Sequence, residues 1–453
     1  MTQRFRSERR ATAPRNMPSS LRLLRTRRFL PLFATQFLGA LNDNVLKAAT
    51  VILLTFRSGE WTSIDAGVLA NLAGGLFILP FFLCSALAGQ LADRHDKALI
   101  ARWVKAFEIV IVLIAGVGLA AHSIAVLLGA IGLLGLHSTF FGPVKYAILP
   151  EHLPPEELTA ANALIEVGTF TAILLGTLLG GVLAASEQAG LMIGATGLTI
   201  ALVGFATSTS IPAAPGVASM RAAPIKPFGE TWRSLRRLAA HRTIGLATLG
   251  VSWFWLYGAV LLAQIPAFAR QVLGGAESTV TLMLALFTLG VSAGSMICAR
   301  IARRAAAWGW SMAGASGLSL FALDLATDSA AITTGASPLD LASVLATAGS
   351  IRVMTDLVMI GLCGGLFIVP LYTLLQVHAE AGHRSRTIAT NNIVNALFMV
   401  TGTLVAGAAL ARGAGLSTLF VGLALGNLAG AVCIVWGLRR ERPVSQVPGA
   451  SPP

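Results

Sequence analysis

The chain has 453 residues, of which 55% are hydrophobic and only 12% are charged. Soluble domains carry roughly 25% charged residues, so the composition excludes an ordinary soluble enzyme. Apolar stretches of about 20 residues or more, the length that crosses a bilayer as a helix, recur along the whole chain. We therefore expect an all-α, polytopic integral membrane protein.

Twelve apolar runs bounded by charged and turn residues predict membrane-spanning helices. In chain order these are 29–56, 67–91, 98–121, 123–149, 160–185, 190–211, 243–270, 278–301, 308–327, 351–377, 387–411 and 416–437. A basic tail over 1–28 precedes them, and a second tail over 438–453 follows. A linker over 212–242 separates two six-helix halves, 29–211 and 243–437, and its segment WRSLRRLAAHR predicts an amphipathic helix on the membrane surface.

The net charge of +13 indicates topology rather than a nucleic-acid partner. Of the 33 Lys and Arg, 27 lie in the tails, the linker and alternate connections, four lie in connections on the other side, and two lie within spans. By the positive-inside rule, the tails and the linker are cytoplasmic.

Ionisable residues inside apolar spans are expensive, so each is a candidate for function. Asp43 lies about 20 Å along the first helix from its start, near the middle of the membrane. Lys47 is one turn further on and close enough for an intrahelical ion pair. A pair that only neutralises itself is one interpretation; flanking Asn42 and Asn44 favour a wider polar wall that contacts substrate.

Three further groups have two interpretations each. Lys105 and Glu108 are spaced for an ion pair in the third span, which is either structural or functional. Lys145 ends the fourth span and either extends to the membrane surface or binds an anion. Glu166 lies in the fifth span as a polar-wall or proton-carrying candidate.

The two halves carry traces of one repeat. Pro143 corresponds to Pro370, and the spacing Asn162-x3-Glu166 corresponds to Asn391-x3-Asn395. Two six-helix halves joined by a long cytoplasmic linker resemble the major-facilitator arrangement, in which the substrate cavity lies between the halves and opens alternately to either side.

The connection between the second and third spans strengthens this resemblance. This connection is similar to the major-facilitator signature G-x-L-A-D-R-x-G-R-K. It reads Gly89-Gln-Leu-Ala-Asp93-Arg94-His-Asp96-Lys, so that Asp96 stands where the family has glycine. The resemblance implies that Gly89 permits close helix contact and that Asp93 and Arg94 latch the cytoplasmic side.

Four segments resemble the bacterial lysophospholipid transporters, and most closely the transporter half of their fusions to 2-acylglycerophosphoethanolamine acyltransferase. They are Gln36-Phe37 with Asn42-Asp43-Asn44, FGPVKYAIL over 141–149, NALIE over 162–166 with AILLG over 172–176, and NNIVNA over 391–396. The resemblance implies that lysophosphatidylethanolamine and lysophosphatidylglycerol move from the outer to the cytoplasmic leaflet of the bacterial inner membrane.

The resemblance also implies acting residues, namely Asp43, Lys145, Asn162, Glu166 and Asn391. We add Asn42, Asn44, Lys47 and Asn395 as substrate-binding candidates, and Gly89, Asp93 and Arg94 as gating candidates. The chain carries no acyltransferase segment after its spans, so we expect a separate acyltransferase to restore the second acyl chain. We expect membrane lipids as further partners.

Two alternatives remain open on the residues alone. A proton-coupled exporter of drugs or small metabolites would use Asp43 and Glu166 as proton carriers. A membrane-embedded enzyme would use the G-x-S-x-G pattern over 290–294, but that motif requires a strand-to-helix turn and this one lies in a predicted helix. The four cysteines lie in separate apolar runs without metal-ligand spacing, so we expect neither metal nor cofactor.

Overall fold

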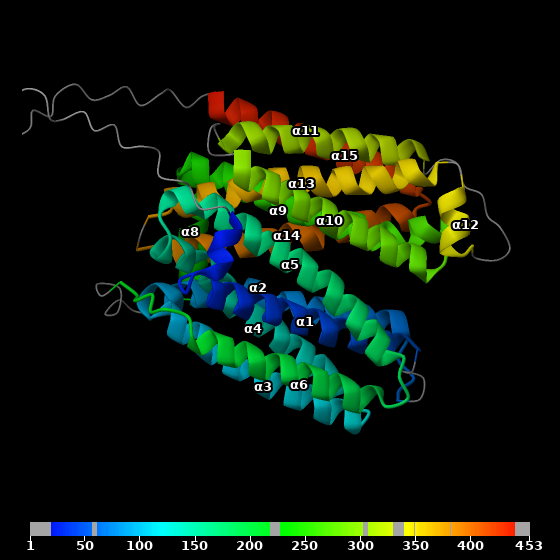
Figure 1. Cartoon of the computed structure of the whole chain (residues 1–453), viewed down its shortest axis with the longest axis horizontal. Coiled ribbons are helices and arrows are strands. Elements are labelled where there is room, and N and C mark those ends of the chain that lie inside the picture. Colours follow the sequence, from blue (N-terminus) through cyan, green and yellow to red (C-terminus); the bar gives the residue numbers. More distant parts are fainter. Residues whose placement is uncertain are drawn as a thin grey trace, which may run out of the picture.

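The computed structural model describes residues 20–56, 61–217, 227–301, 307–328, 339–347, 349–380 and 382–439. In these ranges the chain is almost entirely helical (Figure 1). The predicted tails therefore lie largely outside the described residues, as do Arg57, Arg221, Arg303 and Arg304 from the charge tally.

The first half contains six long helices, whose starts are set by local capping. They are α1 (Leu30–Phe56), α2 (Ala66–Arg94), α3 (Lys97–Ala120), α4 (Ile124–His152), α5 (Pro155–Ala184) and α6 (Ala189–Thr209). The side chains of Asp65, Asp96 and Ser123 accept hydrogen bonds from the first turns of α2, α3 and α4. Pro155 occupies the first position of α5, where a missing N–H costs nothing.

The second half repeats this pattern with α9 (Arg242–Gln271), α10 (Glu277–Ile301), α11 (Ala307–Asp328), α13 (Ser350–His378), α14 (Arg384–Ala411) and α15 (Leu416–Arg439). Three short elements complete the described structure: η1 (Ser20–Arg25), α8 (Pro227–Ala240) in the linker, and α12 (Leu341–Ala346) between α11 and α13. α8 confirms the amphipathic helix predicted there.

Eleven of the described helices are long and apolar enough to cross a membrane. The remaining predicted span, 308–327, coincides with α11, a 22-residue helix that packs between α13 and α15. α11 is less apolar because glycine and serine alternate with its large residues. The twelve-helix arrangement is therefore present. The position of α11 depends more on its packing against α13 and α15 than on its own hydropathy.

Closely spaced glycines set the tightest helix contacts. Gly290 and Gly294 of α10 face the backbone of α13, and Gly361 and Gly365 of α13 face the backbone of α10, so that a Cβ at any of them would collide with a main chain. This contact explains the G-x-S-x-G pattern as a small-residue packing motif inside a helix.

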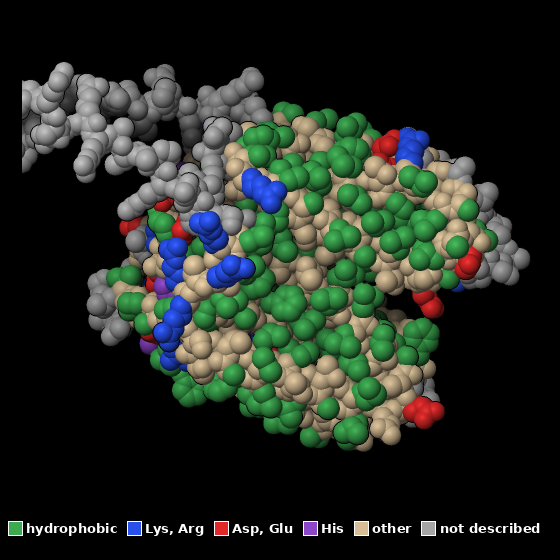
Figure 2. All heavy atoms as spheres, in the orientation of Figure 1, with side chains coloured by type: hydrophobic (Ala, Val, Ile, Leu, Met, Phe, Trp, Pro, Cys, Tyr) green, Lys and Arg blue, Asp and Glu red, His purple; other side chains and the backbone are tan. Residues whose placement is uncertain are grey.

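The helices form two bundles, α1–α6 and α9–α15, that meet chiefly where α5 contacts α10 and α2 contacts α14 (Figure 1). Lys and Arg gather at one end of the molecule (Figure 2). We call it the basic end; it carries the α2–α3, α4–α5 and α13–α14 connections. At the opposite end, the surface in Figure 2 is notched between the two halves.

Candidate functional site

The candidate site lies where polar side chains of α4 and α5 meet α9 and α13 across the boundary between the halves. The rings of Tyr146 and Tyr372 stack with their centroids 4.3 Å apart. The Tyr146 hydroxyl donates to Glu166 over 2.7 Å, and the Trp255 indole donates to the Tyr372 hydroxyl over 3.0 Å. Glu166 is completely buried, so this hydrogen bond helps to offset the cost of placing it there.

One turn nearer the basic end, amide groups connect the halves directly. Asn162 donates to Gln376 over 2.7 Å and to the Thr373 hydroxyl over 3.1 Å. Gln376 in turn donates to the Asn162 side chain over 3.0 Å and to the Tyr146 carbonyl over 3.2 Å. These buried hydrogen bonds close the space between α4, α5 and α13.

Asp43 makes its contacts with α4, which corrects the expected pair with Lys47. The Ser138 hydroxyl donates to Asp43, and the His137 ring nitrogen Nδ1 lies 3.7 Å from its carboxylate. In the part of the chain that the structure describes, no ion pair joins Asp43 to Lys47. The Lys47 ammonium instead lies 4.5 Å from the centroid of the Phe77 ring.

Asn42 and Asn44 do not form one wall with Asp43. Asn42 is fully buried and donates to Glu108 of α3 over 2.6 Å, whereas Asn44 donates to the carbonyl of Ala40 in its own helix. Three consecutive residues of α1 point in different directions because each helical residue turns by about 100°.

Glu108 is the centre of a buried charged cluster. It pairs with Lys105, confirming the expected ion pair, and the second ring nitrogen of His137, Nε2, lies 3.2 Å from its carboxylate. The His137 ring therefore lies between two carboxylates, those of Glu108 and Asp43. A lone histidine in an apolar run gives no sign of its partners, so the sequence analysis missed His137 and Ser138.

Lys145 is half-buried, and its ammonium lies 4.8 Å from the centroid of the Tyr146 ring. The carboxylates of Glu166 and Asp43 attract it electrostatically. Lys47 is likewise half-buried. Two lysines held over aromatic rings inside the bundle are suited to meet an anion there.

The remaining candidates of the second half lie in α14. The Asn395 side chain accepts a hydrogen bond from Ser252 of α9 over 2.7 Å. Asn391 is completely buried, and its amide has no hydrogen-bond partner among the described residues. An unsatisfied buried amide is costly. A different packing of the helices, or a polar group of a ligand, would provide the hydrogen bonds that the Asn391 amide lacks.

The gating candidates connect the two halves at the basic end. Asp93, at the end of α2, accepts hydrogen bonds from the backbone N–H groups of Ser385 and Arg386 over 2.9 and 3.3 Å, and pairs with the Arg386 guanidinium at 3.3 Å. These are the first residues of α14, whose dipole favours a negative charge there. Gly89 lies against the α14 backbone, and Arg94 is buried, with Gly216 close to its backbone.

In the described ranges, no group of three or more His, Cys, Asp or Glu side chains is placed to hold a metal ion. Cys84, Cys298, Cys363 and Cys433 are unpaired thiols in separate helices. The site therefore offers carboxylates, amides, aromatic rings and two lysines.

Two helical bundles that meet around buried polar side chains are the arrangement of membrane transporters that work by alternating access. The Major Facilitator Superfamily profile matches residues 32–358. The chain belongs to this superfamily.

The sequence is also similar to curated transporters. It is 27% identical over 382 residues to the lysophospholipid transporter LplT of Yersinia pestis strain Pestoides F, covering 82% of this chain and 84% of the relative. LplT of Yersinia pseudotuberculosis strain IP32953 gives the same values. The crystal structure of the human organic anion transporter MFSD10 has the same fold, with a TM-score of 0.70 at 16% identity, covering 92% of this chain and all of that one.

Proposed function

We propose that this protein transports lysophospholipids, namely lysophosphatidylethanolamine or lysophosphatidylglycerol, from the outer to the cytoplasmic leaflet of a bacterial inner membrane. The observation that carries the proposal is the similarity to lysophospholipid transporters over 82% of the chain, which is long enough to include both halves. A separate acyltransferase then restores the second acyl chain.

The charges at the candidate site fit such a headgroup. Lys145 and Lys47 supply positive charge for the phosphate, and a charge-assisted hydrogen bond to phosphate is about twice as strong as a neutral one. Asp43 and Glu166 supply negative charge for the ethanolamine ammonium. Asn162, Asn391 and Asn395 add amide groups that can bind glycerol or phosphate oxygens.

The arrangement of the halves fits uptake from the outer side. Asp93 with α14, and Asn162 with Gln376, hold the halves together at the basic end. The notch in Figure 2 lies at the other end. With the basic end on the cytoplasmic side, this is a state that accepts substrate from outside, and rocking of the halves releases it inside.

Uptake by spheroplasts tests the proposal. Cells that lack their own lysophospholipid uptake receive this protein, the double variant Lys47→Gln with Lys145→Gln, or the control Arg412→Gln, which removes an exposed surface charge. We expect wild type and the control to accumulate labelled lysophosphatidylethanolamine, and the double variant to lose most of it. Uptake no higher than in cells without the protein, despite normal membrane insertion, would refute lysophospholipid transport.

One observation favours a second candidate, proton-coupled export of drugs or small metabolites. The His137 ring lies between the carboxylates of Asp43 and Glu108, and ionisable side chains gathered within membrane spans mark ion pathways as well as substrate pathways. Export would appear as efflux of a fluorescent drug that stops when the pH gradient is collapsed, in membranes where lysophospholipid uptake is absent.

A further inference from the structure

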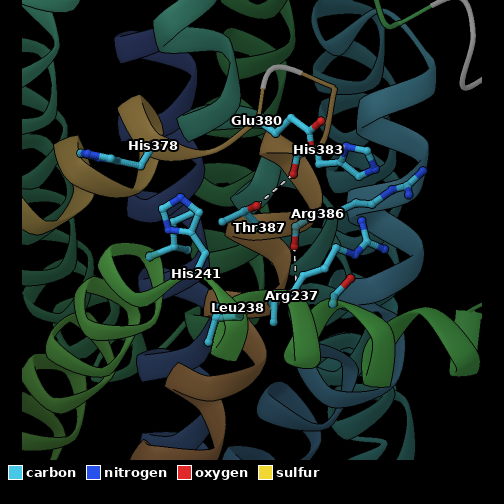
Figure 3. Close-up of a pocket in the computed structure, with 11 residues that line it drawn as sticks. Arg237, Leu238, His241, His378, Glu380, His383, Arg386 and Thr387 are labelled. Carbon is cyan, nitrogen blue, oxygen red and sulfur yellow. Dashed lines mark hydrogen bonds and ion pairs between the residues drawn. The ribbon is translucent and has the colours of Figure 1, made fainter. Parts of the chain in front are cut away.

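A separate pocket of about 200 Å³ opens at the basic end, outside the site described above. Four elements form it: α8, the start of α9, the end of α13 and the start of α14 (Figure 3). The volume is below the roughly 300–1,000 Å³ of pockets for drug-sized ligands, so the pocket suits a small group.

Basic and hydroxyl side chains dominate the lining. They are Arg237, Arg386, His241, His378, His383, Ser234, Thr387 and Thr390. The lining contains one carboxylate, Glu380, but its side chain is 80% exposed and lies 3.4 Å from His383, at the rim. The interior of the pocket is therefore suited to an anion.

Ser234 adds a hydroxyl to the basic side chains of the lining. The residue is only 9% exposed and lines the pocket from α8. Arg237 follows three positions later, so both side chains lie on the same face of α8. An oxyanion in the pocket would accept a hydrogen bond from the Ser234 hydroxyl and an ion pair from Arg237.

Two helix starts reinforce the positive potential. His241 and His383 are the N-cap residues of α9 and α14, and neither side chain caps its own helix. The first turns of these helices carry partial positive charge that attracts anions.

Arg386 belongs both to this pocket and to the contact that holds the halves together. It lines the pocket, and its Nε lies 3.3 Å from the Asp93 carboxylate of α2. An anion that binds Arg386 therefore competes with Asp93 for the same guanidinium group.

We propose that this pocket binds a phosphate group and that binding weakens the contact between Asp93 and α14. The phosphate belongs either to an anionic phospholipid of the adjacent leaflet or to a soluble phosphate. α8 is a strongly amphipathic helix whose Trp232 is 64% exposed, and such helices lie at the membrane surface, within reach of lipid headgroups. The pocket accepts the headgroup, while acyl chains stay in the bilayer.

Binding of radiolabelled inorganic phosphate to the purified full-length protein in detergent tests the site. We expect saturable binding by wild type and at least a tenfold weaker affinity in Arg237→Gln combined with Ser234→Ala. Arg236→Gln is the matched control, because Arg236 neighbours Arg237 but lies over the Trp232 ring outside the pocket. No saturable binding, or equal losses in the control and the double variant, would overturn the proposal.

Lipid nanodiscs distinguish the two sources of phosphate. If a lipid headgroup is the ligand, phosphatidylglycerol in the nanodisc displaces the labelled phosphate and phosphatidylcholine alone does not. If the ligand is soluble phosphate, both nanodiscs leave binding unchanged. Either result supports the phosphate site and assigns its source.

The proposed competition between phosphate and Asp93 can be measured separately. If bound phosphate weakens the contact between Asp93 and Arg386, then loss of that contact must strengthen phosphate binding, because coupling is reciprocal. Asp93→Asn removes the charge that competes for Arg386, so we expect this variant to bind phosphate severalfold more tightly than wild type. Unchanged affinity in folded, monodisperse Asp93→Asn protein would refute the coupling.

Discussion

At the scale of single residues, the buried cluster around Glu108 shows how charges are accommodated inside an apolar bundle. Lys105 is completely buried and passes between α1 and α6, where Gly39 and Gly204 leave room for its side chain. Its charge balances that of Glu108, and Asn42 and His137 contact the same carboxylate. Removing one partner would leave the other charged and unpaired.

We therefore expect Lys105→Met to destabilise the protein strongly. Breaking a buried ion pair by removing one partner costs about 3–5 kcal/mol. The double variant Lys105→Met with Glu108→Gln should recover much of this loss, because no unpaired charge remains. The stability of the single and the double variant is measured by thermal unfolding in detergent, with size-exclusion fluorescence as the readout. A double variant as unstable as the single one would show that Lys105 contributes by packing alone.

Lys145 allows the proposed phosphate contact to be tested separately. Lys145→Ala should lower lysophospholipid uptake about tenfold, equivalent to about 1.4 kcal/mol, whereas Lys145→Arg should keep part of it because the charge remains. Initial uptake rates, normalised to protein in the membrane, provide the comparison. Wild-type uptake rates in both variants would show that Lys145 does not bind the phosphate and would favour the other interpretation, a side chain that extends to the membrane surface.

The sequence identified the ionisable residues within spans but not all their partners. Lys105 and Glu108 pair within one helix, so their spacing was enough. Asp43 and Lys47 have similar spacing, yet Ser138 and His137 of α4 approach Asp43, and Phe77 of α2 approaches Lys47. Partners on other helices depend on how helices cross, which a single sequence does not specify.

At the scale of elements, the contact between α10 and α13 relies on the absence of side chains. Gly290→Ala places a methyl group against the Val358 carbonyl of α13, so we expect a loss of about 1–3 kcal/mol from overpacking. Gly422→Ala is the control, since no atom lies within 4 Å of its added methyl. Melting temperatures of the two purified variants test this, and equal values would argue against a glycine-dependent contact.

Hydropathy located the helices well but placed some of their ends poorly. α5 begins at Pro155, whereas the predicted span begins at 160, because Glu156 and Glu157 are too polar for a span yet stabilise a first helical turn. α12 was not predicted, since six residues are too few to show a periodic pattern. The positions of charged residues therefore predict which part of a helix lies in the membrane better than they predict where the helix begins.

At the scale of the whole molecule, the charge asymmetry makes the sharpest test of orientation. The basic end carries Arg94, Lys97, Arg237 and Arg386, and Lys or Arg near span ends is retained on the cytoplasmic side. We expect reporters fused after Pro212 and after Pro453 to report cytoplasm. A reporter inserted at Ala414, in the turn between α14 and α15, should report the opposite side. If all three report one side, or either of the first two lies outside, the twelve-span arrangement with a cytoplasmic basic end is wrong, and with it the proposed direction of transport.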